Sequence, residues 1–177
     1  ALSRPMIRHT ENPDISIQTN IIGTANVVLS CIKNKTKLVY ASTDYVYPGD
    51  SGNYTETDSL LPVNSYAWSK LGGECSVMLY DNSLILRICM TEKPFVHNKA
   101  LADSKRSLIY IDSAAKVCLT ILEQHGIINV GGPNTTSYEF VLENEKLDLD
   151  KIYIKDINEP MAKDSTMNLN KLKDVLK

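Results

Sequence analysis

The sequence predicts an α/β chain in which helices cover both faces of a parallel sheet. Three short apolar runs, rich in β-branched residues and bounded by polar ones, are typical of buried parallel strands: residues 37–41, 83–90 and 127–130. Longer segments with apolar residues at helical spacing alternate with them: residues 14–33, 65–80 and 112–124. This alternation is typical of doubly wound folds, in which helices connect parallel strands.

Each expected element has a local sequence signal. The first helix carries its apolar side chains on one side: Ile21, Ile22, Ala25, Val28, Leu29 and Ile32. A long polar loop, residues 48–64, leads to the second helix, for which Ser65 is the expected N-cap. After the last strand, Gly131-Gly132-Pro133 predicts a turn rather than a phosphate cradle, because Pro133 lacks an amide donor.

The remaining segments are expected to form a small second domain. Its expected strand is residues 152–154 and its expected closing helix is residues 169–176. We therefore expect residues 1–92 and 111–132 to form the sheet domain. Residues 93–110 and 133–177 would form a small α/β domain that binds the substrate.

Composition and charge are those of an ordinary soluble chain. Hydrophobic residues make up 43% of the 177 residues, charged residues 23%, and the formal net charge is −2. These values argue against a disordered chain and against a basic nucleic-acid binder. No uninterrupted apolar stretch reaches the roughly 18 residues of a membrane span, and no signal-peptide pattern opens the chain. We expect a cytoplasmic protein with no nucleic-acid or membrane partner.

Cysteines and histidines show no metal-site or disulfide spacing. Cys31, Cys75, Cys89 and Cys118 are scattered, without a Cys-x-x-Cys pair, so buried reduced thiols are expected. The three histidines, His9, His97 and His125, are isolated from one another. We assign no metal.

The most informative residues follow the first strand. Ser42, Thr43 and Asp44 come at its carboxyl end, which is the ligand-binding edge of an open α/β sheet. Tyr66 and Lys70 are one helical turn apart, so both side chains share a face, about 5 to 6 Å apart at Cβ. An ammonium neighbour lowers a tyrosine pKa by roughly 1 to 3 units from about 10. A Tyr-x-x-x-Lys pair alone arises about once by chance in such a chain, but the polar strand end favours a proton relay for carbonyl chemistry.

Several motifs resemble those of the extended short-chain dehydrogenase/reductase family, within the NAD-dependent epimerase/dehydratase superfamily. They are Asn20-Ile21-Ile22-Gly23-Thr24, Ser42-Thr43-Asp44-Tyr45-Val46-Tyr47, Tyr54-Thr55-Glu56-Thr57-Asp58, Pro62-Val63-Asn64-Ser65-Tyr66, Ser69-Lys70-Leu71-Gly72-Gly73-Glu74 and Arg106-Ser107-Leu108-Ile109-Tyr110-Ile111. The dTDP-4-dehydrorhamnose reductase-like branch is the most similar. The resemblance implies a Rossmann-like fold, an NAD or NADP cofactor, a nucleotide-sugar substrate, and a homodimer formed through the helices at 14–33 and 65–80.

One departure from the family pattern is large. The family begins with a glycine-rich turn that binds the dinucleotide pyrophosphate at a helix N-terminus, and this sequence has no such motif. Ala1-Leu2-Ser3-Arg4 instead resembles the family's loop after the fourth strand. We expect the first two or so βαβ units, roughly 60 to 70 residues, to be missing. The 177 residues alone are expected to bind a dinucleotide poorly or not at all.

The resemblance assigns roles residue by residue. It implies these catalytic residues: Thr43, Asp44, Tyr66 and Lys70. It implies these cofactor-binding residues: Ala1, Leu2, Arg4, Asn20, Ser42, Tyr66, Lys70, Ile88 and Cys89. It implies these substrate-binding residues: Thr43, Met90 and Arg106. For Asn20, an ordinary polar residue near a helix start is an equally open reading. For Arg106, the alternative to a diphosphate partner is a surface arginine.

The implied reaction is hydride transfer between a nicotinamide and the C4 carbonyl of the sugar, with Tyr66 as the proton donor. Nucleotide-sugar 4,6-dehydratases of this family carry a glutamate where this chain has Tyr45. A phenol is a poor base for a carbon acid, so a reductase is favoured over a dehydratase. A 4-epimerase uses the same groups and stays open. A further alternative is a reductase-like subunit without catalysis, as in one methionine adenosyltransferase.

Overall fold

The computed structural model describes the backbone of residues 7–177 and the side chains from residue 9 onward. The predicted α/β fold is confirmed, and its centre is a parallel sheet in the order β1, β2, β7. These strands are β1 (Leu38–Thr43), β2 (Ser83–Ile88) and β7 (Gly126–Val130). β2 lies in the middle and is buried along its whole length. Side chains of such a strand meet helices on both faces, which explains its nearly continuous apolar sequence.

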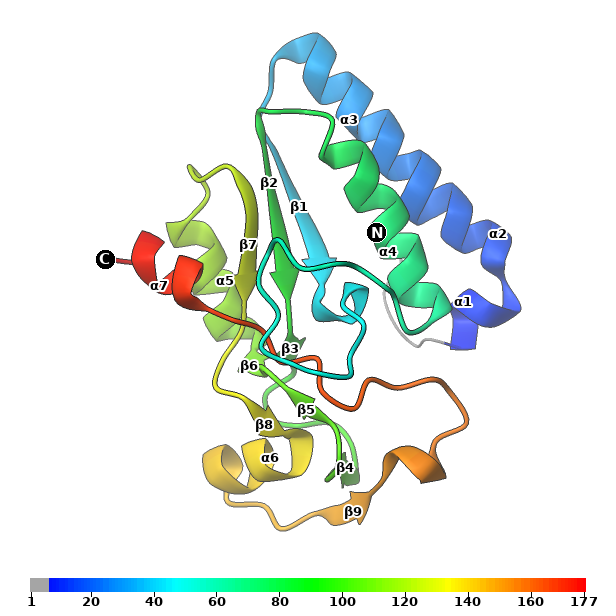
Figure 1. The fold of residues 1–177 in the computed structure, drawn as a ribbon, viewed down its shortest axis with the longest axis vertical. Helices are drawn as coiled ribbons and strands as arrows, with labels where there is room; N and C mark the ends of the chain where they lie inside the picture. The colour runs from blue at the N-terminus through cyan, green and yellow to red at the C-terminus, as the bar shows by residue number, and fades with distance from the viewer. Residues whose placement is uncertain (1–6) are drawn as a thin grey trace.

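Helices cover both faces of this sheet (Figure 1). On one face lie α3 (Gly23–Asn34) and α4 (Ser65–Val77), whose Val28 and Val77 pack with Tyr40 and Ile85. On the other face lie α5 (Ile111–Thr120) and α7 (Asn170–Val175), which pack against the alternate side chains of β2, including Leu84. This two-sided cover is the Rossmann-like, doubly wound arrangement.

The helix expected at residues 14–33 is a continuous helical run, but it is not α-helical throughout. It consists of α2 (Pro13–Ser16), the π-helical segment η1 (Ile17–Ile22) and α3. A short helix, α1 (Ile7–Glu11), precedes it. The sequence pattern did not reveal the π-helical segment. Such segments recur at functional sites because they re-aim the side chains of one turn.

This helical run also modifies the expectation about apolar stretches. By length and composition alone, Pro13–Asn34 is apolar enough to cross a membrane, with a mean hydropathy of 1.4. Core helices of soluble proteins pass the same test, so the feature is weak evidence of a membrane span. In the structure the run lies along α4, and Val28 packs onto the sheet.

Three two-stranded sheets lie beyond the carboxyl ends of the main strands, in the lower part of Figure 1. They pair β3 (Met90–Thr91) with β6 (Ile109–Tyr110), β4 (Lys99–Leu101) with β9 (Asp150–Ile152), and β5 (Lys105–Arg106) with β8 (Thr135–Thr136). Helix α6 (Ser137–Glu145) packs beside β4. An apolar core joins this part to the strand ends and contains Val46, Tyr47, Cys89, Leu108, Phe140 and Met167.

Several element ends differ from expectation. The N-cap of α4 is Asn64, whose side chain accepts a hydrogen bond from the Ala67 amide at 2.9 Å; Ser65 is already the first helical residue. The helix expected to reach residue 124 ends at Thr120. The strand expected at 152–154 is β9, and residue 154 begins the short 3-10 helix η3 (Ile154–Asp156).

Two helices also differ from expectation: one was not expected at all, and the other packs in a different place. α6 was not expected, although Thr136 and Glu139 form a capping box that marks its start. α7 was assigned to the small domain, yet its Leu172 is buried against the main sheet. The turn after β7 is as expected, and it packs so closely that a Cβ on Gly132 would collide with the Leu108 carbonyl oxygen. Its role is therefore close backbone packing.

Candidate active site

The end of β1 presents three polar residues in succession, all buried. Ser42 and Thr43 are the last residues of the strand, and Asp44 begins the short 3-10 helix η2 (Asp44–Val46). Thr43 caps η2, because its Oγ1 accepts a hydrogen bond from the Tyr45 amide at 3.3 Å. Its hydroxyl donates to Asp44 Oδ1 at 3.2 Å. The strand end is thus held in one defined geometry.

Helix α4 lies alongside this strand end and carries three functional groups at four-residue intervals. Tyr66, Lys70 and Glu74 follow one another on one face of the helix, as the spacing predicts. Tyr66 is half-buried, whereas only 3% of Lys70 and none of Glu74 is exposed. The structure therefore brings the predicted phenol and ammonium together on the side of α4 that faces β1.

The Lys70 ammonium is almost enclosed and lies over an aromatic ring. Its Nζ is 4.2 Å from the centroid of the Tyr40 ring. Burial lowers the pKa of Lys70 to about 8, and the nearby Glu74 carboxylate partly opposes this shift. Within the part of the chain that the structure describes, no group accepts a hydrogen bond from Nζ. A buried cation without an acceptor is costly, so this atom is suited to a ligand hydroxyl.

Tyr66 is positioned by side chains from distant parts of the sequence. His9 packs edge-on against its ring, with centroids 5.1 Å apart and an angle of 65°. His9 is fully buried and is hydrogen-bonded through Nδ1 to the Ser16 hydroxyl at 2.8 Å. Tyr66 also packs against the apolar cluster that contains Tyr45. No sequence pattern indicates that His9, which is isolated from the other histidines, contacts this tyrosine.

Asn20 is linked to the same turn of α4. It lies in the π-helical segment η1 and is fully buried, and its Nδ2 donates to the Ser69 hydroxyl at 2.9 Å. Ser69 in turn donates to the Tyr66 carbonyl at 2.7 Å. The structure thus brings Asn20 next to the predicted relay, between Tyr66 and Lys70. Its role as a cofactor partner stays a prediction.

Arg106 is engaged by a carboxylate of the chain itself. Its Nε and Nη2 donate to Asp44 at 2.7 to 3.0 Å, and the guanidinium lies 4.3 Å above the Tyr45 ring. Asp44 also accepts a hydrogen bond from the Ser165 hydroxyl at 3.0 Å. Arg106 is therefore neither a surface residue nor wholly free. Only its Nη1 has no hydrogen bond among the described residues.

A second buried ion pair lies beneath the relay and was not expected. Arg87 of β2 donates through Nε to Glu74 at 3.1 Å, and the Ser42 hydroxyl donates to the same carboxylate at 2.6 Å. Arg87 also donates to the Tyr47 hydroxyl at 2.9 Å. A signal was present in the sequence, because an arginine inside an otherwise apolar strand needs a buried partner. The partner itself is not evident from the sequence.

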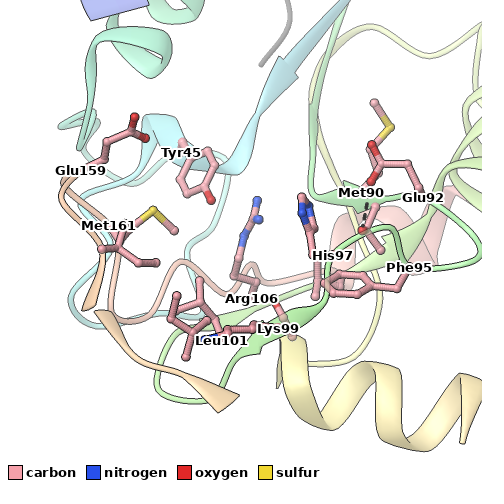
Figure 2. A pocket seen from close by; sticks show the side chains of 15 residues that line it. Tyr45, Met90, Glu92, Phe95, His97, Lys99, Leu101, Arg106, Glu159 and Met161 are labelled. Atoms are coloured by element: carbon pink, nitrogen blue, oxygen red, sulfur yellow. Dashed lines mark hydrogen bonds between the residues drawn. The ribbon is translucent and has the colours of Figure 1, made fainter. Parts of the chain in front are cut away.

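Beside these groups lies a cavity of about 500 Å³. Figure 2 shows Arg106 pointing into it, with Tyr45, Glu159 and Met161 on one side and Met90, Glu92, Phe95 and His97 on the other. Among the predicted site residues that the structure describes, only Met90 and Arg106 line this cavity. Tyr66 packs against the same apolar cluster as two lining residues, Tyr45 and Met161, so the relay and the cavity are neighbours.

The remaining predicted residues have varied positions. Ile88 ends β2 and is 9% exposed. Cys89 is fully buried, and burial raises the pKa of its thiol, so it is a poor nucleophile. Ala1, Leu2 and Arg4 lie outside the described residues. All four cysteines are free thiols, and within residues 7–177 no cluster of His, Cys, Asp or Glu has the proximity a metal ion needs.

Comparison with protein families gives one match. The RmlD substrate binding domain family matches residues 9–93, which include β1, α4 and the relay. Among curated proteins, methionine adenosyltransferase 2 subunit beta of Rattus norvegicus is 37% identical over 79 residues, covering 43% of this chain and 23% of that protein. The dTDP-4-dehydrorhamnose reductase of Mycobacterium tuberculosis is 35% identical over 72 residues, covering 38% of this chain and 24% of that protein. These matches span about a quarter of the relatives' length.

Solved structures resemble the chain over its whole length. A hypothetical dTDP-4-dehydrorhamnose reductase from Sulfolobus tokodaii superimposes with a TM-score of 0.85 at 25% identity, covering 100% of this chain and 71% of that one. A dTDP-4-dehydrorhamnose reductase from Bacillus anthracis, solved in complex with NADP, gives a TM-score of 0.82 at 22% identity, covering 98% and 70%. The similarity therefore extends across both the main sheet and the smaller sheets.

Proposed function

We propose that this chain, which belongs to the extended short-chain dehydrogenase/reductase family, is part of an NAD(P)-dependent enzyme that reduces a 4-keto nucleotide sugar. The observation that carries the proposal is the buried Lys70 ammonium, one helical turn from Tyr66 and beside the polar end of β1. Without a ligand, this ammonium has no acceptor among the described residues. A hydroxyl of the nicotinamide ribose is a fitting acceptor.

In this proposal the protein provides proton transfer and orientation. Bound NAD or NADP would supply the hydride. Tyr66 donates a proton to the carbonyl oxygen as it becomes an alkoxide. The Thr43 hydroxyl, whose one proton points to Asp44 in the structure, would turn to donate a hydrogen bond to the same oxygen. The positive charge of Lys70 favours the tyrosinate that remains. Asn20, Ser42, Ile88 and Cys89 are proposed to border the cofactor.

The substrate is proposed to enter the cavity beside the relay. Arg106 would face its diphosphate with Nη1, the one guanidinium nitrogen that Asp44 does not occupy. Met90 would border the sugar from the opposite wall. Asp44, proposed from the family pattern to assist catalysis, would act by orienting Arg106, because its carboxylate already accepts hydrogen bonds from Arg106, Thr43 and Ser165.

The choice among family reactions turns on Tyr45. It lines the cavity, and its ring lies under the Arg106 guanidinium. By the family pattern, a 4,6-dehydratase has a glutamate at this sequence position. We therefore rank a reductase above a 4,6-dehydratase. A 4-epimerase needs the same relay and stays the alternative. A subunit without catalysis is the second candidate, and the observation that favours it is the 37% identity to methionine adenosyltransferase 2 subunit beta.

The deciding experiment measures whether the hydride of the reduced cofactor is consumed as product forms. Full-length protein is supplied with a 4-keto-6-deoxy nucleotide sugar and reduced cofactor, and product is quantified beside the loss of nicotinamide absorbance. A reductase consumes one reduced cofactor per product, whereas an epimerase returns the hydride and shows no net oxidation. Product without oxidation would replace the reductase with the epimerase. Binding of both ligands without turnover would favour the subunit without catalysis.

Assembly and location complete the proposal. We propose a cytoplasmic homodimer that associates through the helices at 14–33 and 65–80. We also propose a division into domains at 1–92 with 111–132 and 93–110 with 133–177, in which α7 at the end of the second domain returns to pack on the main sheet. Large apolar side chains are exposed on these helices: Val27, Leu29, Ile32, Trp68 and Met78. Contiguous exposed apolar surface marks an interaction site. Light scattering of wild type and of Leu29→Glu tests the dimer, because a charge in its interface should release monomers.

A further inference from the structure

The surroundings of Lys70 raise a question that the proposed reaction leaves open, namely what holds its ammonium before a ligand arrives. A flexible lysine with no acceptor would normally turn toward water, because desolvation of its charge is unfavourable. Here the side chain is 97% removed from solvent, since only 3% is exposed. Something other than a hydrogen bond must therefore stabilise it in this position.

Tyr40 supplies a platform for the ammonium. Its ring lies 4.2 Å from Lys70 Nζ, within the range of an attractive cation–π contact, which is strongest when the cation is desolvated. The ring is itself locked, because the Tyr40 hydroxyl donates to the Lys70 backbone carbonyl at 2.9 Å. Burial raises the pKa of the phenol, so the ring stays neutral. One residue of β1 thus contacts Lys70 through both its ring and its hydroxyl.

Glu74 supplies a buried negative charge one helical turn further along α4. None of its side chain is exposed, and its carboxylate accepts hydrogen bonds from the Ser42 hydroxyl at 2.6 Å and from Arg87 Nε at 3.1 Å. Because Lys70 and Glu74 share a helix face, the carboxylate acts on the ammonium through space.

We propose that Tyr40 and Glu74 are positioning residues that hold the Lys70 side chain in place and in its charged form before the cofactor binds. The ring of Tyr40 fixes where the ammonium lies, and the carboxylate of Glu74 offsets the loss of water around it. The inference rests on the role proposed above for Lys70. It adds that the side chain of Lys70 is held by residues outside the relay. These are Tyr40 of β1, Glu74 of α4 and, through Glu74, Arg87 of β2.

The other titratable groups near Lys70 do not provide this support. Tyr66 lies one turn before it on α4 and carries a phenol, not a carboxylate. Arg87 of β2 is a cation and lies beyond Glu74. The Cys75 thiol is on the exposed side of α4. The π-helical segment η1 and α3 contribute the uncharged groups Asn20 and Thr24 near this face.

The test is an NMR titration of Lys70 in the full-length protein, prepared with lysine labelled with ¹³C at Cε. The Lys70 signal is assigned by its loss in Lys70→Arg, and it should titrate near the expected pKa of about 8. Tyr40→Leu removes the ring and should lower the Lys70 pKa by at least about half a unit. The matched control Tyr40→Phe keeps the ring and should leave the titration within about 0.3 units of wild type.

Glu74→Gln should lower the Lys70 pKa by about one unit or more, because the opposing charge is lost. Since this change leaves a buried guanidinium unpaired and risks unfolding, the double variant Glu74→Gln with Arg87→Met is measured as well and should shift the titration in the same direction. The proposal fails if Tyr40→Phe shifts the Lys70 titration as far as Tyr40→Leu does, or if neither Glu74 variant moves the titration.

This readout is separate from turnover. If the titration shifts as expected while the protein consumes no reduced cofactor with any keto sugar, the proposed function fails and the support of Lys70 stands. If the protein is an active reductase and the Lys70 titration is unshifted in all variants, the proposed function stands. The proposed support of Lys70 by Tyr40 and Glu74 then fails. In an active protein, the pH profile of kcat should move in the same order, most in the Glu74 variants and least in Tyr40→Phe.

Discussion

The carboxylate of Asp44 and the guanidinium of Arg106, 62 positions apart in sequence, form an ion pair through Nε and Nη2 with almost no exposure to water. Asp44 belongs to the end of the main sheet, and Arg106 belongs to β5 of the smaller sheets. The pair therefore fixes the cavity wall relative to the relay. It also explains why an arginine aimed into a substrate cavity keeps one orientation without a ligand.

This pair is expected to show strong energetic coupling. Arg106→Met should lower the free energy of unfolding by about 3 to 5 kcal/mol, because it leaves a buried carboxylate without its partner. Asp44→Asn should have a similar cost. The double variant should lose clearly less than the sum of the two, as urea unfolding of all four proteins will measure. Additive losses would mean that the two residues do not stabilise each other.

Removal of the Tyr66 hydroxyl should separate chemistry from binding. Tyr66→Phe keeps the ring that packs against His9 and Tyr45 but removes the transferable proton. We expect cofactor affinity near wild type and a loss of turnover of about 10² to 10⁴-fold. Tyr80→Phe is the matched control, since the Tyr80 hydroxyl lies beyond the far end of α4 and contacts the carbonyls of Cys31 and Thr36 and the Asn82 side chain. Retention of more than about half the activity in Tyr66→Phe would exclude Tyr66 as the acid.

Stability should depend on pH through Lys70. Its folded pKa of about 8 lies below the value near 10.4 of an unfolded chain. Between these values the unfolded state binds more protons, so the free energy of unfolding should rise as pH increases from about 8 to about 10. The rise is at most a few kcal/mol, at about 1.4 kcal/mol per unit.

Lys70→Met isolates this effect, because every other buried group titrates in both proteins. Urea unfolding at about pH 7 and about pH 10 should show wild type gaining stability relative to the variant. Parallel pH dependence in the two proteins would show that Lys70 is not held in a buried, desolvated position.

Two neighbouring glycines of α4 should respond differently to alanine. A Cβ on Gly73 would lie 2.5 Å from the Asn20 carbonyl oxygen, which is backbone, and 2.6 Å from the Tyr40 hydroxyl, which is hydrogen-bonded to the Lys70 carbonyl. Gly73→Ala should therefore lower the free energy of unfolding by about 1 to 3 kcal/mol. At Gly72 the neighbour is the side chain of Ile21, which can turn aside. Gly72→Ala should stay within about 1 kcal/mol of wild type, since alanine also favours the helix. Thermal denaturation of wild type and both variants measures the difference in stability.

The sequence predicted the main sheet and its helices because their signals are local. Apolar periodicity in β1, β2 and α4 directly reflects which faces are buried, and the spacing of Tyr66 and Lys70 correctly placed them on one face. The cap of α4 shifted by one residue because Asn64 and Ser65 are both good capping types. We did not predict α6, although the spacing of Thr136 and Glu139 in the sequence is that of a capping box.

Local sequence signals do not predict the polar contacts of the site. A buried ion pair such as Asp44 with Arg106, or Glu74 with Arg87, depends on which strands the fold brings together, and no local pattern encodes the partner. The contact between His9 and Tyr66 has the same origin. The π-helical turns at Ile17–Ile22 lie against α4, and no residue pattern marks them in the sequence.

The π-helical segment makes this helix sensitive to its own length. In an α-helix each residue advances by about 100° around the axis, so removal of one residue from Ile17–Ile22 would restore regular turns and rotate everything before it by that angle. His9 would then leave the Tyr66 ring, while α3 and the sheet kept their places. Related chains that lack one residue at this point are expected to have a regular helix and a different neighbour for the tyrosine.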